Sequence, residues 1–338
     1  MQLQAGRAAL PLALRMGISQ SAGRVSSPDK AIARFIAENS PLPKNSHEII
    51  ERAVTRIGRQ RLGVVETFLN AGLTTTLTNW WAVPSLRREK VNQVGFAKRS
   101  FVPDTRGERQ VVDRGGDAWP IYCTSDDFSF NVRTAEIAGR MQYDIGTEHV
   151  ENATYNVNLA IQDQALNGLT DSEGNAVTFD GLSAPGLLNS TRTFTYSTWT
   201  GLTGPQIVAV VQTEIDVQRT KGFFGPWTVL VPANYSKVLT SDYGTAYPKT
   251  IVARLQDLGP YAGRNLAVEV VDGLLDNRVV LVQMTSDVVD VIVGQEPTPI
   301  SWQDGPKFNF YWCVLACMVF RMFPNYNGDY GVSAGSAV

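Results

Sequence analysis

The spacing of hydrophobic and polar residues changes along the chain and predicts an α+β protein. Apolar side chains recur at helical spacing from Ser46 onwards and again through 203–219, where Thr203-Gly204-Pro205 can start a helix. Residues 74–78 and Trp80-Trp81 are strand-like. Further strands are predicted at 227–232, 266–271, 278–284 and 287–294. In the long alternating segment 307–323, one face carries Phe308, Phe310, Trp312, Val314, Ala316, Met318 and Phe320.

A long helix is predicted over 134–167. This stretch contains no proline, Thr134 can cap its start, and Gly168 provides a stop. At about 1.5 Å per residue the helix would be roughly 50 Å long, which exceeds the width of most domains. We therefore expect it to run along the outside of a domain. Gly139 and Gly146 are positions at which it can kink.

Residues 91–128 are predicted to form an extended, two-stranded excursion. The strand-rich segments 94–102 and 109–112 flank a turn at Asp104-Thr105-Arg106-Gly107. Both faces are too polar for a core hairpin, and a long exposed hairpin offers unpaired edges. The pattern is therefore more compatible with a hairpin that lies on another subunit.

Charge is distributed unevenly, although the net formal charge is only −2. Residues 1–114 hold 18 Lys and Arg against 9 Asp and Glu, whereas 115–338 hold 12 against 23. Such an asymmetry indicates an anionic partner or the acidic body of another copy, with ordinary solvated charge as the alternative. Residues 1–46 are predicted to be an arm and not a domain. Its basic residues, which suit sequence-independent phosphate contacts, are Arg7, Arg15, Arg24, Lys30 and Arg34.

Catalytic and cofactor motifs are nearly absent. No phosphate-binding glycine loop, dinucleotide fingerprint or nucleophile elbow occurs, and the chain has 2 histidines and 3 cysteines. Asp171–Asn175 offers oxygens for calcium but lacks the full loop, so a simple turn is favoured. Cys313 and Cys317 would lie about 13 Å apart on a strand, and Cys123 is alone in the sequence. We expect no metal and no cofactor.

Lysine and asparagine side chains could form a covalent cross-link between subunits. Lys90 and Lys98 lie at or near the hairpin, and Asn325 and Asn327 lie near the end of the chain. In some shells such residues from neighbouring subunits form an isopeptide bond. An exposed lysine and turn-forming asparagines are the simpler interpretation.

Targeting patterns are also absent. The apolar run at 8–14 is interrupted by Pro11 and followed by Arg15, so it is a poor secretory signal. No stretch approaches the roughly 20 apolar residues of a membrane span. We therefore expect a protein made in a reducing cytoplasm, with no membrane partner.

The order of these parts resembles the major capsid proteins of tailed double-stranded DNA bacteriophages, whose Hong-Kong-97-type fold is shared with encapsulins. The resemblance covers about 90–325. AIQDQALNG (160–168) and GLSAPGLLN (181–189) are similar to the end of the family's spine helix and the loop behind it. Residues 281–303 are similar to its late peripheral-domain strands.

This resemblance implies a domain plan. It comprises an N-terminal arm and helix at 1–90, an extended loop at 91–128, a peripheral domain at 129–203 and 278–338, and an axial domain at 204–277. The spine helix would be 134–167. The extended loop would contact neighbouring subunits through Phe96, Lys98, Arg99, Phe101, Arg106 and Arg109.

The resemblance also implies a function. The chain would be a structural protein, not an enzyme, that self-assembles into an icosahedral shell of pentamers and hexamers around phage DNA. Its location would be the virion, after assembly in the host bacterial cytoplasm, with portal, scaffolding or decoration proteins as further partners. An encapsulin-like compartment is the alternative, and an enzyme with a spatially assembled site is a distant one.

Overall fold

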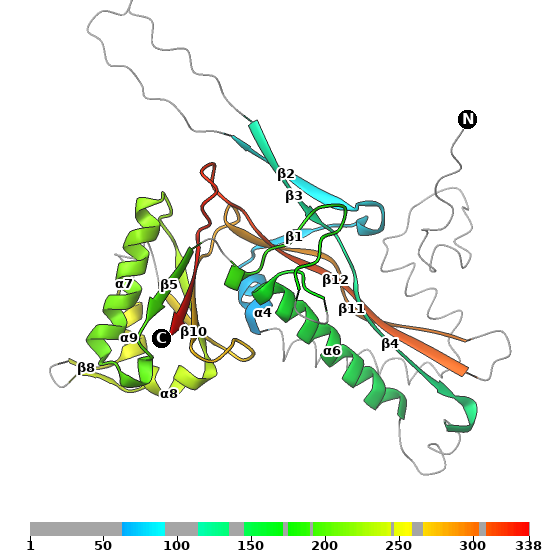
Figure 1. The fold of residues 1–338 in the computed structure, drawn as a ribbon. Helices are drawn as coiled ribbons and strands as arrows, with labels where there is room; N and C mark the ends of the chain where they lie inside the picture. The colour runs from blue at the N-terminus through cyan, green and yellow to red at the C-terminus, as the bar shows by residue number, and fades with distance from the viewer. Residues whose placement is uncertain are drawn as a thin grey trace, which may run out of the picture.

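The computed structural model describes residues 63–91, 114–134, 145–171, 175–189, 192–244, 247–258, 266–303 and 309–337. Figure 1 shows two sheets with helices packed against them and a hairpin that projects away from both. The α+β class expected from the hydrophobic pattern is confirmed.

The first sheet has four strands in the order β1-β11-β12-β4. They are β1 (Thr74–Thr76), β4 (Thr124–Asn131), β11 (Val289–Gln303) and β12 (Asn309–Met322). β1 is parallel to β11, and the other pairs are antiparallel. In β12 the predicted alternation is confirmed, since Trp312, Val314, Ala316, Met318 and Phe320 are buried.

Helix α6 (Ile145–Asn167) lies along one face of this sheet (Figure 1). The His149 ring stacks on Phe128 of β4 at 5.4 Å, and the Gln164 amide bonds the backbone of Phe320 in β12. The predicted helix over 134–167 is thus confirmed from Ile145 to its end. Residues 132–134 are also helical, and 135–144, including Gly139, lie outside the described residues.

The end of α6 depends on two glycines that touch. Gly168 has φ +80°, and a Cβ there would lie 2.5 Å from the carbonyl oxygen of Ala184. A Cβ on Gly186 would lie 2.1 Å from the nitrogen of Gly168. The Leu169 amide donates to the Ala184 carbonyl at 2.9 Å, which closes the loop onto the helix. These contacts explain why the segments 160–168 and 181–189 both carry glycine.

The second sheet has five strands in the order β5-β13-β10-β6-β9. They are β5 (Arg192–Tyr196), β6 (Trp227–Pro232), β9 (Ala267–Val271), β10 (Arg278–Gln283) and β13 (Val332–Ala337). The helices of this unit are α7 (Gly204–Thr220), α8 (Ser236–Leu239) and α9 (Ile251–Gln256), and a small ribbon joins β7 (Asp242–Gly244) to β8 (Tyr247–Thr250).

The sheets divide the chain differently from the expected domain boundaries. The interval 204–277 supplies only β6 and β9, and its sheet is completed by β5, β10 and β13. Strands pair by adjacency in space, so segments assigned to 129–203 and 278–338 enter this sheet. The five-stranded sheet therefore combines strands from both expected domains.

Strand β13 is formed by a Gly- and Ser-rich segment near the end of the chain, where no strand was predicted. Val332, Ser333 and Ala334 are buried between β10 and β5. A Cβ on Gly335 would lie 2.6 Å from the Phe194 ring, so glycine here makes room for an aromatic side chain. Small residues in this strand serve packing and not flexibility.

A buried polar network holds β13 to α7. Glu214 accepts two hydrogen bonds from Arg192 on β5, at 3.0 and 3.1 Å, and a third from Ser333. The Gln218 amide donates to Ser333. The hydrogen bond that Arg192 donates to Glu214 raises the pKa of Arg192. The carboxylate is therefore paired and satisfied, as a buried charge requires.

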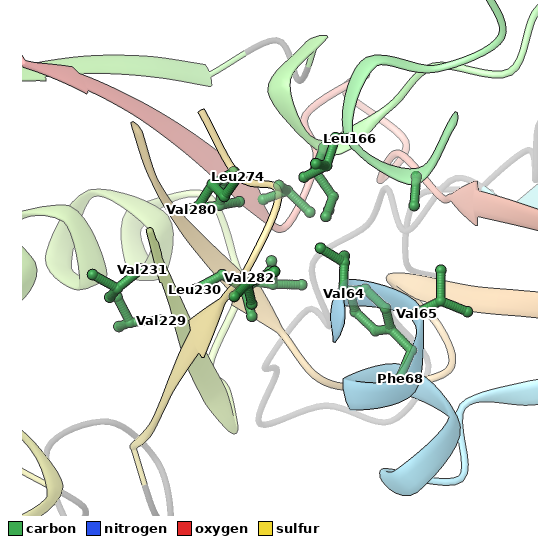
Figure 2. Close-up of a cluster of buried hydrophobic side chains, with 14 of the residues drawn as sticks. Val64, Val65, Phe68, Leu166, Val229, Leu230, Val231, Leu274, Val280 and Val282 are labelled. Atoms are coloured by element: carbon green, nitrogen blue, oxygen red, sulfur yellow. The ribbon is translucent and has the colours of Figure 1, made fainter. Parts of the chain in front are cut away.

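One continuous hydrophobic cluster joins the two sheets. Helix α4 (Gly63–Asn70) contributes Val64, Val65 and Phe68, which lie near Leu166 of α6 and Val282 of β10 (Figure 2). Phe68 also packs on Phe320 at 5.2 Å. Because the core is shared, the two sheets form one packed body in the described part of the chain.

Short 3-10 turns complete the fold at η1 (Trp80–Ala82), η2 (Leu187–Asn189), η3 (Trp199–Gly201) and η4 (Ala233–Tyr235). The predicted strand character of Trp80-Trp81 is wrong. Trp80 is buried while Trp81 stacks on it at 3.6 Å, so aromatic packing decides the local conformation.

Candidate assembly interface

The hairpin consists of β2 (Ser85–Val91) and β3 (Arg114–Pro120), which form a separate two-stranded sheet. Their antiparallel register runs from Ser85 opposite Pro120 to Val91 opposite Arg114. Figure 1 shows this pair leaving the body of the protein. The excursion predicted over 91–128 overlaps this hairpin, and its central part, 92–113, lies outside the described residues. Pairing begins at Ser85, Gly115-Gly116 lies within it, and 124–131 belongs to the first sheet.

The described part of the hairpin has almost no core of its own. Among the side chains described in β2 and β3, only Trp119 and Pro120 are buried, and both lie at the base. An isolated two-stranded hairpin is at best marginally stable in water. The projecting surface is therefore suited to contact with another molecule.

Aromatic and cationic side chains anchor the hairpin base. Trp119 meets Phe323 edge-on, with ring centroids 4.9 Å apart. Arg88 lies 4.0 Å from the Phe323 centroid and donates to the Ser286 carbonyl at 3.2 Å. Arg321 lies 5.1 Å from the same ring. We call Arg88, Trp119, Arg321 and Phe323 the hairpin anchor.

A buried ion pair fixes Arg321 within the first sheet. Its Nε donates to Oδ1 of Asp290 at 2.8 Å, and the two side chains are 4% and 7% exposed. The Thr75 hydroxyl donates to the other oxygen of Asp290 at 2.8 Å. Three strands, β1, β11 and β12, thus position the cation that faces the hairpin.

Two cationic side chains of the hairpin contact residues of the opposite strand. Arg87 packs over Gly116, where a Cβ would lie 2.5 Å from its Nε. Lys90 pairs with Asp117 at 3.0 Å. Asn325 donates to the Lys221 carbonyl and accepts from the Asp329 amide, which is a turn-forming role. Asn325 thus has the turn-forming role of the simpler interpretation, whereas Lys90 is half-buried in an ion pair and is not an exposed lysine. Lys98 lies outside the described residues.

None of the residues predicted for subunit contacts or for the basic arm falls in the described ranges. These residues are Phe96, Lys98, Arg99, Phe101, Arg106 and Arg109 of the loop, and Arg7, Arg15, Arg24, Lys30 and Arg34 of the arm. Their roles remain predictions. The sequence-based reasoning missed the hairpin anchor. A signal for it was present, because Asp290 and Arg321 are opposite charges inside two strongly apolar predicted strands, whose other charges, Asp287 and Lys307, are their first residues.

Candidate chemistry is sparse in the described ranges. Among those residues no group of His, Cys, Asp and Glu is arranged to hold a metal, and no helix is long and apolar enough to cross a membrane. The Asp171 carboxylate accepts from the Asn175 amide at 2.8 Å, as in a simple turn. His149 lies on α6 with its ring stacked on Phe128.

Comparison with known families identifies the chain as a member of DUF6260, a family of unknown function whose model matches residues 107–335. No match is found among curated protein sequences.

Comparison with solved structures shows the fold. The capsid of Myoviridae Phage XM1 is similar with a TM-score of 0.65 and 14% identity, covering 80% of this chain and 92% of that one. A virus-like particle from Pyrococcus furiosus has a TM-score of 0.58 and 13% identity, covering 86% and 98%. A structure from Mycobacterium phage Cain has a TM-score of 0.55 and 10% identity, covering 80% and 89%. The expected Hong-Kong-97-type fold is confirmed, and it is a fold of shell-forming proteins and not of an enzyme family.

Proposed function

We propose that this DUF6260 member is the major capsid protein of a tailed bacteriophage. Many copies would assemble as hexamers and pentamers into a closed icosahedral shell around double-stranded DNA. The observation that carries the proposal is the extent of the fold match, because the phage XM1 capsid is covered over 92% of its chain. A match of that extent is larger than one shared subdomain.

The two sheets would correspond to the two domains of the subunit. The five-stranded sheet with α7 and α9 would be the axial domain, near the centre of a capsomer. The four-stranded sheet with α6 would be the peripheral domain, with α6 as the spine helix. The shared core of Val64, Phe68 and Val282 supports a subunit that is placed in the shell as one body.

The hairpin would join one subunit to the next. Its described strands have free edges and lack a core, and both features are disadvantages in an isolated monomer. A neighbouring copy would cover them. The contact residues predicted from the sequence, including Phe96, Phe101 and Arg109, would then lie against that neighbour.

The basic arm would make non-specific contacts with packaged DNA or with acidic neighbours. Residues 1–114 carry a formal +9 and 115–338 a formal −11, so copies are complementary in charge. The assembled protein would be located in the virion after assembly in the host cytoplasm. Portal, scaffolding or decoration proteins would be its further partners.

Electron microscopy of the purified protein combined with nuclease digestion tests this function. The expected result is closed particles that protect double-stranded DNA from added nuclease when they are isolated from phage-producing cells. Particles that never protect DNA would contradict the capsid assignment. A chain that stays monomeric at all concentrations would contradict shell formation altogether.

A second candidate is a protein compartment shell without a genome. The similarity to the Pyrococcus furiosus virus-like particle, which is covered over 98% of its chain, favours this alternative specifically. The same particles would then enclose protein and no nuclease-protected DNA. Mass spectrometry of the particle contents separates the two candidates.

A further inference from the structure

Cys123 lies beside Cys317, although the sequence shows Cys123 alone. In the β4–β12 ladder, the last paired residues are Thr124 and Ala316. One further step along an antiparallel ladder places Cys123 opposite Cys317. The two thiols are close enough for each to shift the pKa of the other. Cys123 thus occupies the junction at which the chain leaves the hairpin and enters the first sheet.

The backbone spacing at this position suits a disulfide. Opposed residues in an antiparallel pair have Cα atoms about 4.5 or 5.5 Å apart, depending on the type of pair. Disulfides require Cα separations of about 4.4–6.8 Å. Both ladder spacings fall within this range, so the Cα separation permits a bond.

The third strand leaves room for the sulfur of Cys317. Strand β11 has a bulge next to Gly294, and a Cβ at that position would lie 3.0 Å from Sγ of Cys317 and 2.9 Å from Trp80. The sulfur is therefore held in a fixed place beside Cys123.

We propose that Cys123 and Cys317 are a disulfide-forming pair that covalently ties the base of the hairpin to strand β12. This modification goes beyond the proposed shell function, and its formation does not depend on assembly. All three cysteines are free thiols in the structure. Oxidation by a small disulfide, such as oxidised glutathione, would convert the two thiols into a disulfide bond.

The two cysteines have different parts in the exchange. Cys123 is exposed, and the hydrogen bond from Cys317 lowers its pKa, which favours the thiolate nucleophile. Cys317 is buried, and the hydrogen bond with Cys123 together with burial raises its pKa. Cys123 is therefore the residue that first attacks the oxidant.

The reaction balances in two steps. The Cys123 thiolate attacks oxidised glutathione, which forms a Cys123–glutathione disulfide and releases one glutathione thiolate. Cys317 then loses its proton and attacks Sγ of Cys123, which forms the Cys123–Cys317 bond and releases the second glutathione. Two protein thiols lose two electrons in total, and one oxidised glutathione becomes two reduced molecules that take up the two protons.

Cys313 serves as an internal control. It lies on the same face of β12 as Cys317, about 13 Å away at the rise of a strand. Its thiol is hydrogen-bonded to Asp127, and burial raises its pKa. It is neither placed to reach Cys123 nor suited to attack an oxidant.

The test is to incubate the purified full-length chain with oxidised glutathione and to count thiols by intact mass and peptide mapping. The expected product has lost two hydrogens, retains one free thiol, and yields a peptide that links 123 with 317. Reductant reverses the change. Cys313→Ser keeps the product, whereas Cys123→Ser, a change at an exposed site, abolishes it and leaves the mass unchanged.

Three results would overturn the proposal. They are a chain with three free thiols after incubation, a stable glutathione adduct that remains on Cys123, and dimers linked through Cys123. A thermal melt provides a second measurement. The oxidised wild type should melt a few degrees higher than its reduced form, and Cys123→Ser should show no such shift. Equal melting temperatures for the oxidised and reduced wild type would argue against a tie between hairpin and sheet.

Discussion

The guanidinium carbon of Arg321 lies 5.7 Å from the ring centroid of Trp119. This contact joins strand β12 of the body to strand β3 of the hairpin. Because Asp290 holds Arg321 from within the sheet, the direction in which the hairpin leaves the subunit is set by buried side chains. In a shell that direction determines which neighbour the hairpin reaches.

Trp119→Ala should detach the hairpin base without unfolding the body. The ring is 4% exposed, and truncation of a large buried aromatic side chain typically costs about 3–5 kcal/mol. Particle yield, measured by sedimentation, should fall sharply. Far-ultraviolet circular dichroism of the monomer should change little. Phe224→Ala is the matched control, since that ring is 64% exposed and the change should leave yield unaltered.

Asp290→Ala should destabilise the protein by about 3–5 kcal/mol, because it leaves the Arg321 cation buried without its partner. Urea unfolding measures the free energy of unfolding. The double variant Asp290→Leu with Arg321→Met removes both charges. Its free energy of unfolding should fall by less than that of Asp290→Ala. A double variant that is as unstable as the sum of its single changes would show that the pair is not coupled.

Gly168→Ala and Gly186→Ala should each destabilise the end of α6 by more than about 1 kcal/mol. A Cβ at either position would penetrate the backbone of the facing segment, and Gly168 also has positive φ. Gly201→Ala is the control, because nothing lies within 4 Å of its added Cβ. Thermal melts of the three variants make the comparison, and equal losses in all three would contradict the close-contact argument.

Phe96→Ala and Phe101→Ala should impair assembly more than monomer folding if the hairpin contacts a neighbour. Removing an interface aromatic side chain typically costs 2 kcal/mol or more of binding where it is fully covered. Light scattering during assembly and a melt of the monomer provide the two measurements. A double variant that assembles normally would count heavily against this role.

Charge reversal at Arg7, Arg15 and Arg24 should weaken particles in a salt-dependent way. Electrostatic contacts of an exposed arm are screened within about 10 Å at 0.1 M salt. Particle stability should therefore differ most from wild type at low salt and converge at high salt. An unchanged salt profile would reject an electrostatic role for the arm.

The sequence predicted the elements whose pattern is long and periodic. Helix α6 was predicted because 145–167 has no proline and ends at glycine, and β12 because alternate residues from Trp312 to Phe320 are apolar. In both elements the local pattern and the tertiary packing agree. Such consistency is what makes an element predictable from one sequence.

The elements that were wrong are those in which distant packing overrides local composition. No strand was predicted over 332–337, yet its small residues pair with β10 and make room for the Phe194 ring. Trp80-Trp81 appeared to be a strand, yet a buried ring shapes a turn. Neither environment is encoded within a few residues of the segment itself.

The sequence by itself determined the α+β class, the long helix that ends at Asn167, a projecting excursion and the separation of charge, because periodicity and composition are local properties. Only the tertiary structure decided that Arg321 meets Trp119, that Cys123 meets Cys317, and that β5, β10 and β13 complete one sheet. These relationships join residues that are far apart along the chain. They arise because burying apolar surface brings such strands together, and pairing in space leaves almost no trace in local sequence.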